Sequence, residues 1–137
     1  RDVLGSRGLG DVYKRQTFTA MAGVAVTSLG LYIAAHTASG AAATIFWMSV
    51  SLGALGFSMS ASWSTVISLG GKYTGSVSGW MNLWGNVGGV LAPIVTAFFV
   101  TNYGWNNAFT YTALFGIIAI AAWLFVNPGK QLEGTEE

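Results

Sequence analysis

The chain has 137 residues, of which 53% are hydrophobic and only 8% charged, with a formal net charge of +1 and no cysteine. A soluble domain carries about a quarter charged residues, most of them on its solvated surface. The composition therefore excludes an ordinary water-soluble domain, disulfides and thiolate metal sites, and the near-neutral charge gives no reason to expect a nucleic-acid partner.

The positions of the charges are more informative than their number. Between residues 17 and 129 only Lys72 is charged, and every other Lys, Arg, Asp and Glu lies in residues 1–16 or 130–137. An ionised side chain at the centre of a bilayer costs roughly 2.5–3.5 kcal/mol. The long segment with a single charge therefore predicts a membrane-embedded protein.

Residues 1–16 differ from the rest of the chain. They are polar, contain glycine, show no helical periodicity and lack the apolar core of a signal peptide. Residues 6–16, SRGLGDVYKRQ, resemble the one-frame translation of a tagmentation sequencing adapter. We expect residues 1–16 to be a non-native adapter translation, and native sequence to begin near Thr17. The alternative is a genuine basic cytoplasmic segment.

Four stretches are long and apolar enough to cross a membrane. A helix needs about 20 predominantly apolar residues to span a hydrocarbon core about 30 Å thick. The qualifying stretches are residues 17–36, 41–69, 76–101 and 107–126. Their apolar runs are continuous, whereas β-barrel strands alternate apolar and polar residues. The sequence predicts an all-α, polytopic transmembrane bundle with a bend at Pro93, followed by a tail over residues 130–137.

The basic residues suggest an orientation. Lys72 precedes the third stretch and Lys130 follows the fourth, so two crossings separate them and both lie on one side. The connections near Ser39 and Asn102 contain neither Lys nor Arg. Because basic loops stay in the cytoplasm, we expect the Lys72 turn and the C-terminus to be cytoplasmic.

The third stretch is rich in glycine, with two GxxxG motifs. Such spacing lets a neighbouring helix backbone approach closely. The predicted helix-packing residues are Gly75, Gly79, Gly85, Gly88, Gly89 and Pro93. Generic packing between membrane helices is the simplest interpretation of this motif.

Two groups of polar residues stand out within the stretches. Asn82 and Asn86 are one helical turn apart, and an amide in an apolar span needs a hydrogen-bond partner. Ser60 and Trp63 share one side of the second stretch and offer a hydroxyl and an indole N–H. A ligand would satisfy both groups. The alternatives are an interhelical tie for the asparagines and, for the serines of this stretch, hydrogen bonds to carbonyls four residues earlier.

Catalytic chemistry has no visible basis in this chain. His36 is the single histidine, and the four stretches contain no Asp, Glu, Lys, Arg or Cys with which it could form a relay. The chain contains no paired carboxylates and no metal-ligand cluster. We predict no catalytic residue, no metal, no cofactor and no enzymatic activity.

A longer pattern carries a family resemblance. Residues 72–79 read KYTGSVSG and are followed by Asn82, Gly85, Asn86, Gly88, Gly89 and Pro93. Over residues 60–124 the chain resembles the anion:cation symporter family of the major facilitator superfamily, which includes carriers of galactonate, glucarate and hexuronates. The resemblance implies helices nine to twelve of a twelve-helix fold. In relatives the turn before Lys72 commonly contains an acidic residue and a proline, where this chain has SLGG over residues 68–71.

The resemblance also implies roles for individual residues. It places Ser60, Trp63 and Asn82 in contact with the substrate, and it assigns the coupling carboxylates and an anion-pairing arginine to helices outside this chain. We therefore expect a fragment of an inner-membrane secondary transporter of a small organic anion, such as a sugar acid, coupled to H⁺ or Na⁺. Its partners would be the bilayer and the remaining N-terminal helices. The alternatives are a small four-helix membrane scaffold or assembly protein and, more distantly, a membrane-embedded enzyme.

Overall fold

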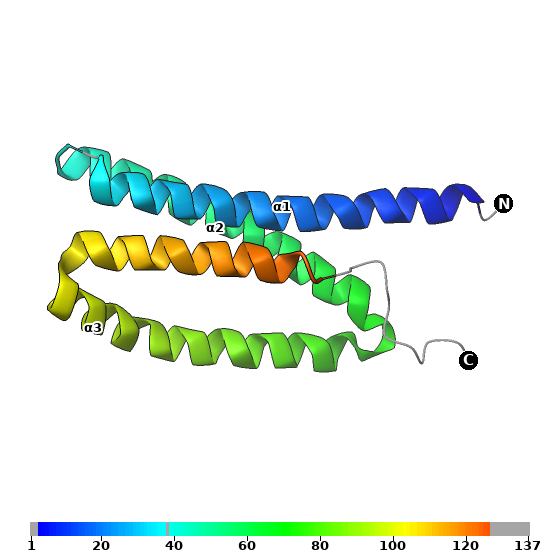
Figure 1. Cartoon of the computed structure of the whole chain (residues 1–137). Coiled ribbons are helices and arrows are strands. Elements are labelled where there is room, and N and C mark those ends of the chain that lie inside the picture. The colour runs from blue at the N-terminus through cyan, green and yellow to red at the C-terminus, as the bar shows by residue number, and fades with distance from the viewer. Residues whose placement is uncertain (1–2, 38, 127–137) are drawn as a thin grey trace.

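The computed structural model describes residues 3–37 and 39–126, with side chains from Lys14 onward. These residues form three long helical elements and one short turn of 3₁₀-helix, with no strand among them. The elements in chain order are α1 (Val3–His36), α2 (Ala41–Gly70), η1 (Gly71–Tyr73) and α3 (Thr74–Trp123). The expected all-α class is confirmed, and Figure 1 shows α3 folding back on itself beside α1 and α2.

Helix α1 is longer than the sequence predicts. It begins at Val3 rather than near Thr17, and its N-terminal part projects beyond the other helices (Figure 1). No proline interrupts residues 3–36. Each residue added to an existing helix contributes one further backbone hydrogen bond, so the polar segment continues the helix that the apolar segment forms.

Helix α3 is a hairpin of two arms. We call residues 74–103 the first arm and residues 105–123 the second arm. Gly104 alone has non-helical backbone angles inside α3, with φ 79° and ψ 169°. The sequence predicts a connection of several residues around 102–106, whereas the structure reverses the chain at this one glycine. At Pro93 the backbone stays helical.

Side chains on both sides of Gly104 stabilise the reversal. The Asn102 amide donates to the Phe98 carbonyl at 2.8 Å, and the Asn107 amide donates to the Tyr103 carbonyl at 2.7 Å. The rings of Phe99 and Tyr111 lie 4.5 Å apart and join the two arms. Helical hydrogen bonding thus continues almost to Gly104 from each direction.

Small residues hold α1 against α2. On both helices they recur at alternating spacings of three and four residues, which places each set on one face. The sets are Ala20, Gly23, Thr27, Gly30 and Ala34 on α1, and Ser51, Ala54, Ser58, Ala61 and Thr65 on α2. The Thr27 hydroxyl donates across the interface to the Ser51 carbonyl at 3.0 Å. The second arm of α3 joins this pair where Gly116 meets Ser28 and Val24.

The outward surface is apolar over most of its area. Two helical stretches, Lys14–His36 and Ala41–Trp123, each contain an 18-residue window with a mean hydropathy of 1.7, and none of that window in the second stretch is buried. As one straight helix the 83 residues of the second stretch would extend about 125 Å, roughly four times the thickness of a hydrocarbon core. Reversals at η1 and Gly104 divide it into three segments of about membrane length. Apolar helices exposed in this way suit a lipid environment.

Candidate functional site

Ser60 and Trp63 lie on the side of α2 that faces away from α1. A helix turns about 100° per residue. Ser60 is two residues from the buried Ser58, and Trp63 is two residues from both Ala61 and Thr65, which are also buried. A separation of two residues is a rotation of about 200°. Both predicted site residues are therefore directed away from the α1 interface, and both are exposed.

The hydroxyl groups near Ser60 divide into two kinds. The Ser62 hydroxyl donates to the Ser58 carbonyl at 2.8 Å, and the Ser64 hydroxyl donates to the Ser60 carbonyl at 3.0 Å. The Ser60 hydroxyl and the Trp63 indole N–H have no hydrogen-bond partner within the described part of the chain. Bonding to the preceding turn thus accounts for Ser62 and Ser64 but not for Ser60.

The two asparagines of the first arm also differ in whether their side chains form a hydrogen bond. The Asn86 amide donates to the Asn82 carbonyl of the main chain at 2.8 Å. The Asn82 side chain is exposed and has no hydrogen-bond partner among residues 14–37 and 39–126. Alternating spacings of four and three residues place both amides on one face of the first arm, together with Gly75, Gly79, Gly89 and Pro93. We call these six residues the amide stripe.

The predicted packing glycines have no close contact with another element among the described residues. A Cβ at Gly75, Gly79, Gly85, Gly88 or Gly89 would meet no atom within 4 Å. Close contacts between α1 and the other helices occur instead at three glycines that the sequence interpretation missed, Gly23, Gly30 and Gly116. A Cβ at Gly23 would lie 2.8 Å from the Ala54 carbonyl oxygen. The alternating spacing of small residues in the first two stretches could have predicted the contacts at Gly23 and Gly30.

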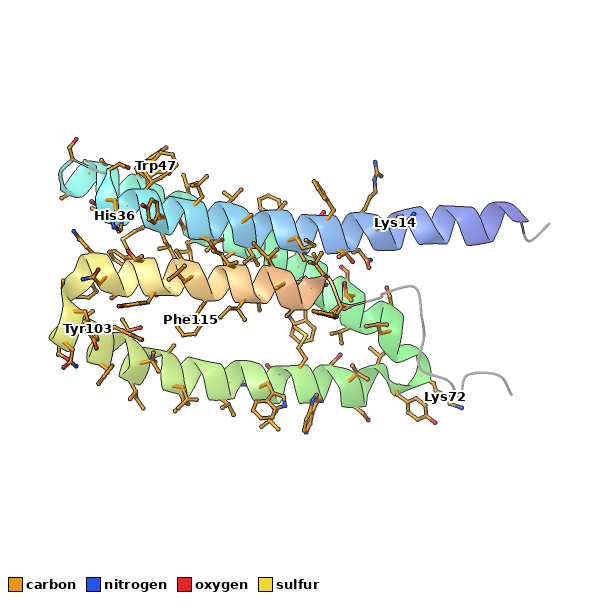
Figure 2. All side chains as sticks on the ribbon, viewed as in Figure 1. Lys14, His36, Trp47, Lys72, Tyr103 and Phe115 are labelled. Carbon is orange, nitrogen blue, oxygen red and sulfur yellow. The ribbon has the colours of Figure 1, made fainter. Side chains whose placement is uncertain are left out.

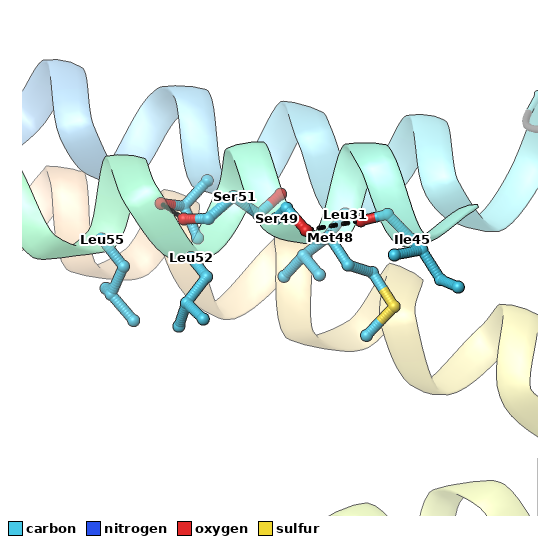
Figure 3. A pocket seen from close by; sticks show the side chains of 8 residues that line it. Leu31, Ile45, Met48, Ser49, Ser51, Leu52 and Leu55 are labelled. Carbon is cyan, nitrogen blue, oxygen red and sulfur yellow. Dashed lines mark hydrogen bonds between the residues drawn. The ribbon is translucent and has the colours of Figure 1, made fainter. Parts of the chain in front are cut away.

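The structure does not join the three predicted substrate residues. Ser60 and Trp63 lie together on α2, but no hydrogen bond or ring contact within the described residues connects them to Asn82. Four clefts in the described part of the chain are lined by other residues. The cleft of about 420 Å³ in Figure 3 lies between α1 and α2, and its lining is almost entirely apolar. It consists of Thr27, Leu31, Ile45, Met48, Ser49, Ser51, Leu52 and Leu55.

The labelled lysines lie toward one end of the bundle, whereas aromatic side chains lie at both ends. Figure 2 shows Lys14 and Lys72 toward one end, and His36, Trp47 and Tyr103 at the other. Lys72 extends over the ring of Tyr73, with its Nζ atom 5.5 Å from the ring centroid. His36 stacks on Tyr32 with ring centroids 4.5 Å apart. Within the described residues no group of three His, Cys, Asp or Glu side chains is placed to hold a metal ion.

Two comparisons place the chain among known proteins. A family model described as Major Facilitator Superfamily matches residues 8–137. The chain is 30% identical over 144 aligned positions to a protein of Cupriavidus necator named "Probable sulfoacetate transporter SauU". That alignment covers 99% of this chain and 33% of the relative, so the chain spans about a third of the relative's length. No solved structure matches the chain significantly.

Proposed function

The chain belongs to the Major Facilitator Superfamily, and we propose that it is the C-terminal part of a secondary transporter that moves a small organic anion by alternating access. In this proposal the four membrane segments are helices nine to twelve of a twelve-helix fold. A proton or sodium gradient drives transport, and the coupling carboxylates lie in the N-terminal helices. Family membership and the similarity to a named transporter support a transport role.

The observation that carries the proposal is the set of unused donors on α2 and the first arm. Ser60, Trp63 and Asn82 present a hydroxyl, an indole N–H and an amide that no described residue satisfies. An unsatisfied polar group inside a membrane costs several kcal/mol. The oxygens of an anionic substrate would satisfy all three donors. Transporters of this kind bind substrate near the middle of the membrane, between repeats.

The relative's name favours an organic anion as the substrate class. Sulfoacetate carries a carboxylate and a sulfonate, and the sugar acids suggested by the family resemblance also carry a carboxylate. Neutral donors such as those of Ser60, Trp63 and Asn82 bind carboxylate and sulfonate oxygens without introducing a charge into the span. We propose a small carboxylate-containing anion, with sulfoacetate and galactonate as the first candidates.

Uptake of radiolabelled sulfoacetate and galactonate by the full-length protein in proteoliposomes tests this function. Trp63→Ala and Asn82→Ala should each lower uptake at subsaturating substrate about tenfold, because one hydrogen bond to a charged group contributes about 1.5 kcal/mol. Ser64→Ala and Asn86→Ala are matched controls, since their side chains already bond to the preceding turn. Unimpaired uptake in both site variants at equal expression would remove Trp63 and Asn82 from the binding site.

The proposal also requires more protein than this chain. We propose that residues 1–16 are adapter sequence and that the native gene continues upstream of Thr17 through about eight further hydrophobic spans. The family match begins at residue 8 and includes part of this segment, so the test must come from DNA. A source contig should contain the adapter sequence at this point. A continuous native reading frame that encodes residues 1–16 would contradict the adapter origin.

A further inference from the structure

Pro93 leaves one main-chain carbonyl of the first arm without its usual helical donor. In an α-helix each backbone N–H donates to the carbonyl four residues earlier. Residue 93 would therefore donate to Gly89, but proline has no N–H. The backbone stays helical at both residues, so the bond is missing from an otherwise regular helix. No described side chain donates to the Gly89 carbonyl in its place, because the nearby Asn86 amide bonds to the Asn82 carbonyl.

The Gly89 carbonyl opens onto the amide stripe. A helical carbonyl points along the axis toward the residue four positions later, and Gly89 and Pro93 both belong to the stripe. Side chains of a helix cover the turn that precedes their own position. The side chains nearest to this carbonyl are therefore the methyl group of Ala92 and the ring of Pro93, and all three residues are exposed. The carbonyl oxygen is accessible from the face that also presents the Asn82 amide.

The stripe thus carries an acceptor and a donor that the described chain does not use. An unsatisfied polar group inside a membrane costs several kcal/mol, and a carbonyl freed by proline needs a donor from another helix, from water or from a ligand. Gly89 follows Asn82 by seven residues on the same face, about 10 Å along the helix axis. Such a pair suits a small molecule that offers both an anionic oxygen and a hydroxyl group.

We propose that the Gly89 carbonyl accepts a hydrogen bond from a hydroxyl group of the transported anion and so selects hydroxylated carboxylates. The inference rests on the proposed function and adds a main-chain acceptor to its three side-chain donors. Sulfoacetate has no hydroxyl group, whereas galactonate has one on every carbon beyond its carboxylate. The donors of Ser60, Trp63 and Asn82 bind anionic oxygens of either molecule. The Gly89 carbonyl distinguishes the two candidates.

Two replacements at residue 93 isolate this acceptor in the full-length protein. Pro93→Ala supplies an N–H that bonds to the Gly89 carbonyl and occupies it, and alanine favours the helix. Lactic acid, incorporated at the same position by nonsense suppression, has the same methyl side chain but an ester oxygen in place of the N–H, so the carbonyl stays free. Purified protein is titrated calorimetrically with galactonate and with sulfoacetate, and the ratio of the two affinities is compared.

We expect Pro93→Ala to lower the affinity for galactonate about tenfold, because a substrate hydroxyl loses its acceptor. The affinity for sulfoacetate should not change, and the lactic acid variant should keep the wild-type ratio. An unchanged ratio in Pro93→Ala, or an equal fall in both variants, would overturn the proposal.

Failure of the acceptor and failure of the proposed function give different results. Wild-type protein that transports sulfoacetate but does not bind galactonate would overturn the role of the Gly89 carbonyl and leave the transport role intact. The expected affinity ratios without uptake of either anion into proteoliposomes would contradict the transport role and support the acceptor.

Discussion

Gly23 leaves no room for a side chain where α1 meets α2. A Cβ there would lie 2.8 Å from the Ala54 carbonyl oxygen and 3.0 Å from the Ser58 backbone nitrogen, and backbone atoms of a packed helix cannot move aside cheaply. We expect Gly23→Ala to lower the free energy of unfolding by about 1–3 kcal/mol. Reversible unfolding in mixed detergent micelles measures this quantity.

Gly53 provides the matched control for that measurement. It lies in α2, and a Cβ there would meet no atom within 4 Å. Gly53→Ala should leave the free energy of unfolding unchanged or raise it, because alanine is the better helix former. Equal destabilisation by the two substitutions would show that glycine flexibility, rather than close contact, explains the role of Gly23.

For individual residues, spacing in the sequence predicts which side chains share a helix face but not which residues of other helices lie opposite them. The GxxxG motifs indicate packing at Gly75 and Gly79, yet no described residue comes within 4 Å of a Cβ at either position, whereas Gly23 and Gly30 meet α2 directly. Spacing likewise placed Ser60 beside Trp63 on α2. It contained no information on their distance from Asn82, because that distance depends on how separate helices pack.

The hairpin of α3 depends on the backbone conformation of Gly104. Its φ of 79° and ψ of 169° lie in a region that glycine alone adopts readily, and other residues there cost about 1–3 kcal/mol. We expect Gly104→Ala to lower the thermal midpoint of the purified protein, measured by the loss of its monodisperse peak in gel filtration. Gly85→Ala, inside regular helix with open space around its Cβ, should leave the midpoint unchanged. A midpoint equal to that of Gly85→Ala would contradict the strain argument.

Helix ends were less predictable than helix existence. Apolar runs indicate long helices because backbone groups in a membrane must be satisfied within the segment. The polar residues around Asn102 suggested a loop. In the structure Asn102 and Asn107 are instead part of the helical arms, and their side-chain amides donate to carbonyls four residues earlier. The connection between the arms is therefore reduced to Gly104. Composition alone does not distinguish an amide in a loop from an amide bonded to its own helix.

Across the whole molecule, the chain reverses direction at the two ends of the helical bundle. Figure 1 shows the connection between α1 and α2 and the Gly104 reversal at one end, and η1 and the end of the second arm at the other. Lys72 lies at the latter end (Figure 2). The chain order predicted this alternation, because each membrane crossing moves the chain to the opposite side. Separation of the first arm from the other helices was not predictable, since it depends on contacts between helices.

This arrangement yields a prediction about orientation in the membrane. Basic residues beside a span remain in the cytoplasm, so the end with Lys72 and the C-terminus should be cytoplasmic, and the end with Gly40 and Gly104 should face outward. In the full-length protein, green fluorescent protein inserted after Lys72 or fused after Glu137 should fluoresce, because it folds in the cytoplasm. Alkaline phosphatase inserted after Gly40 or Gly104 should be active, because it needs the oxidising exterior. Active phosphatase after Lys72 would contradict the proposed orientation.

The double variant Lys72→Gln with Lys130→Gln should weaken the preference for this orientation if these two charges determine it. An unchanged pattern of reporter activity would instead assign orientation to the helices outside this chain.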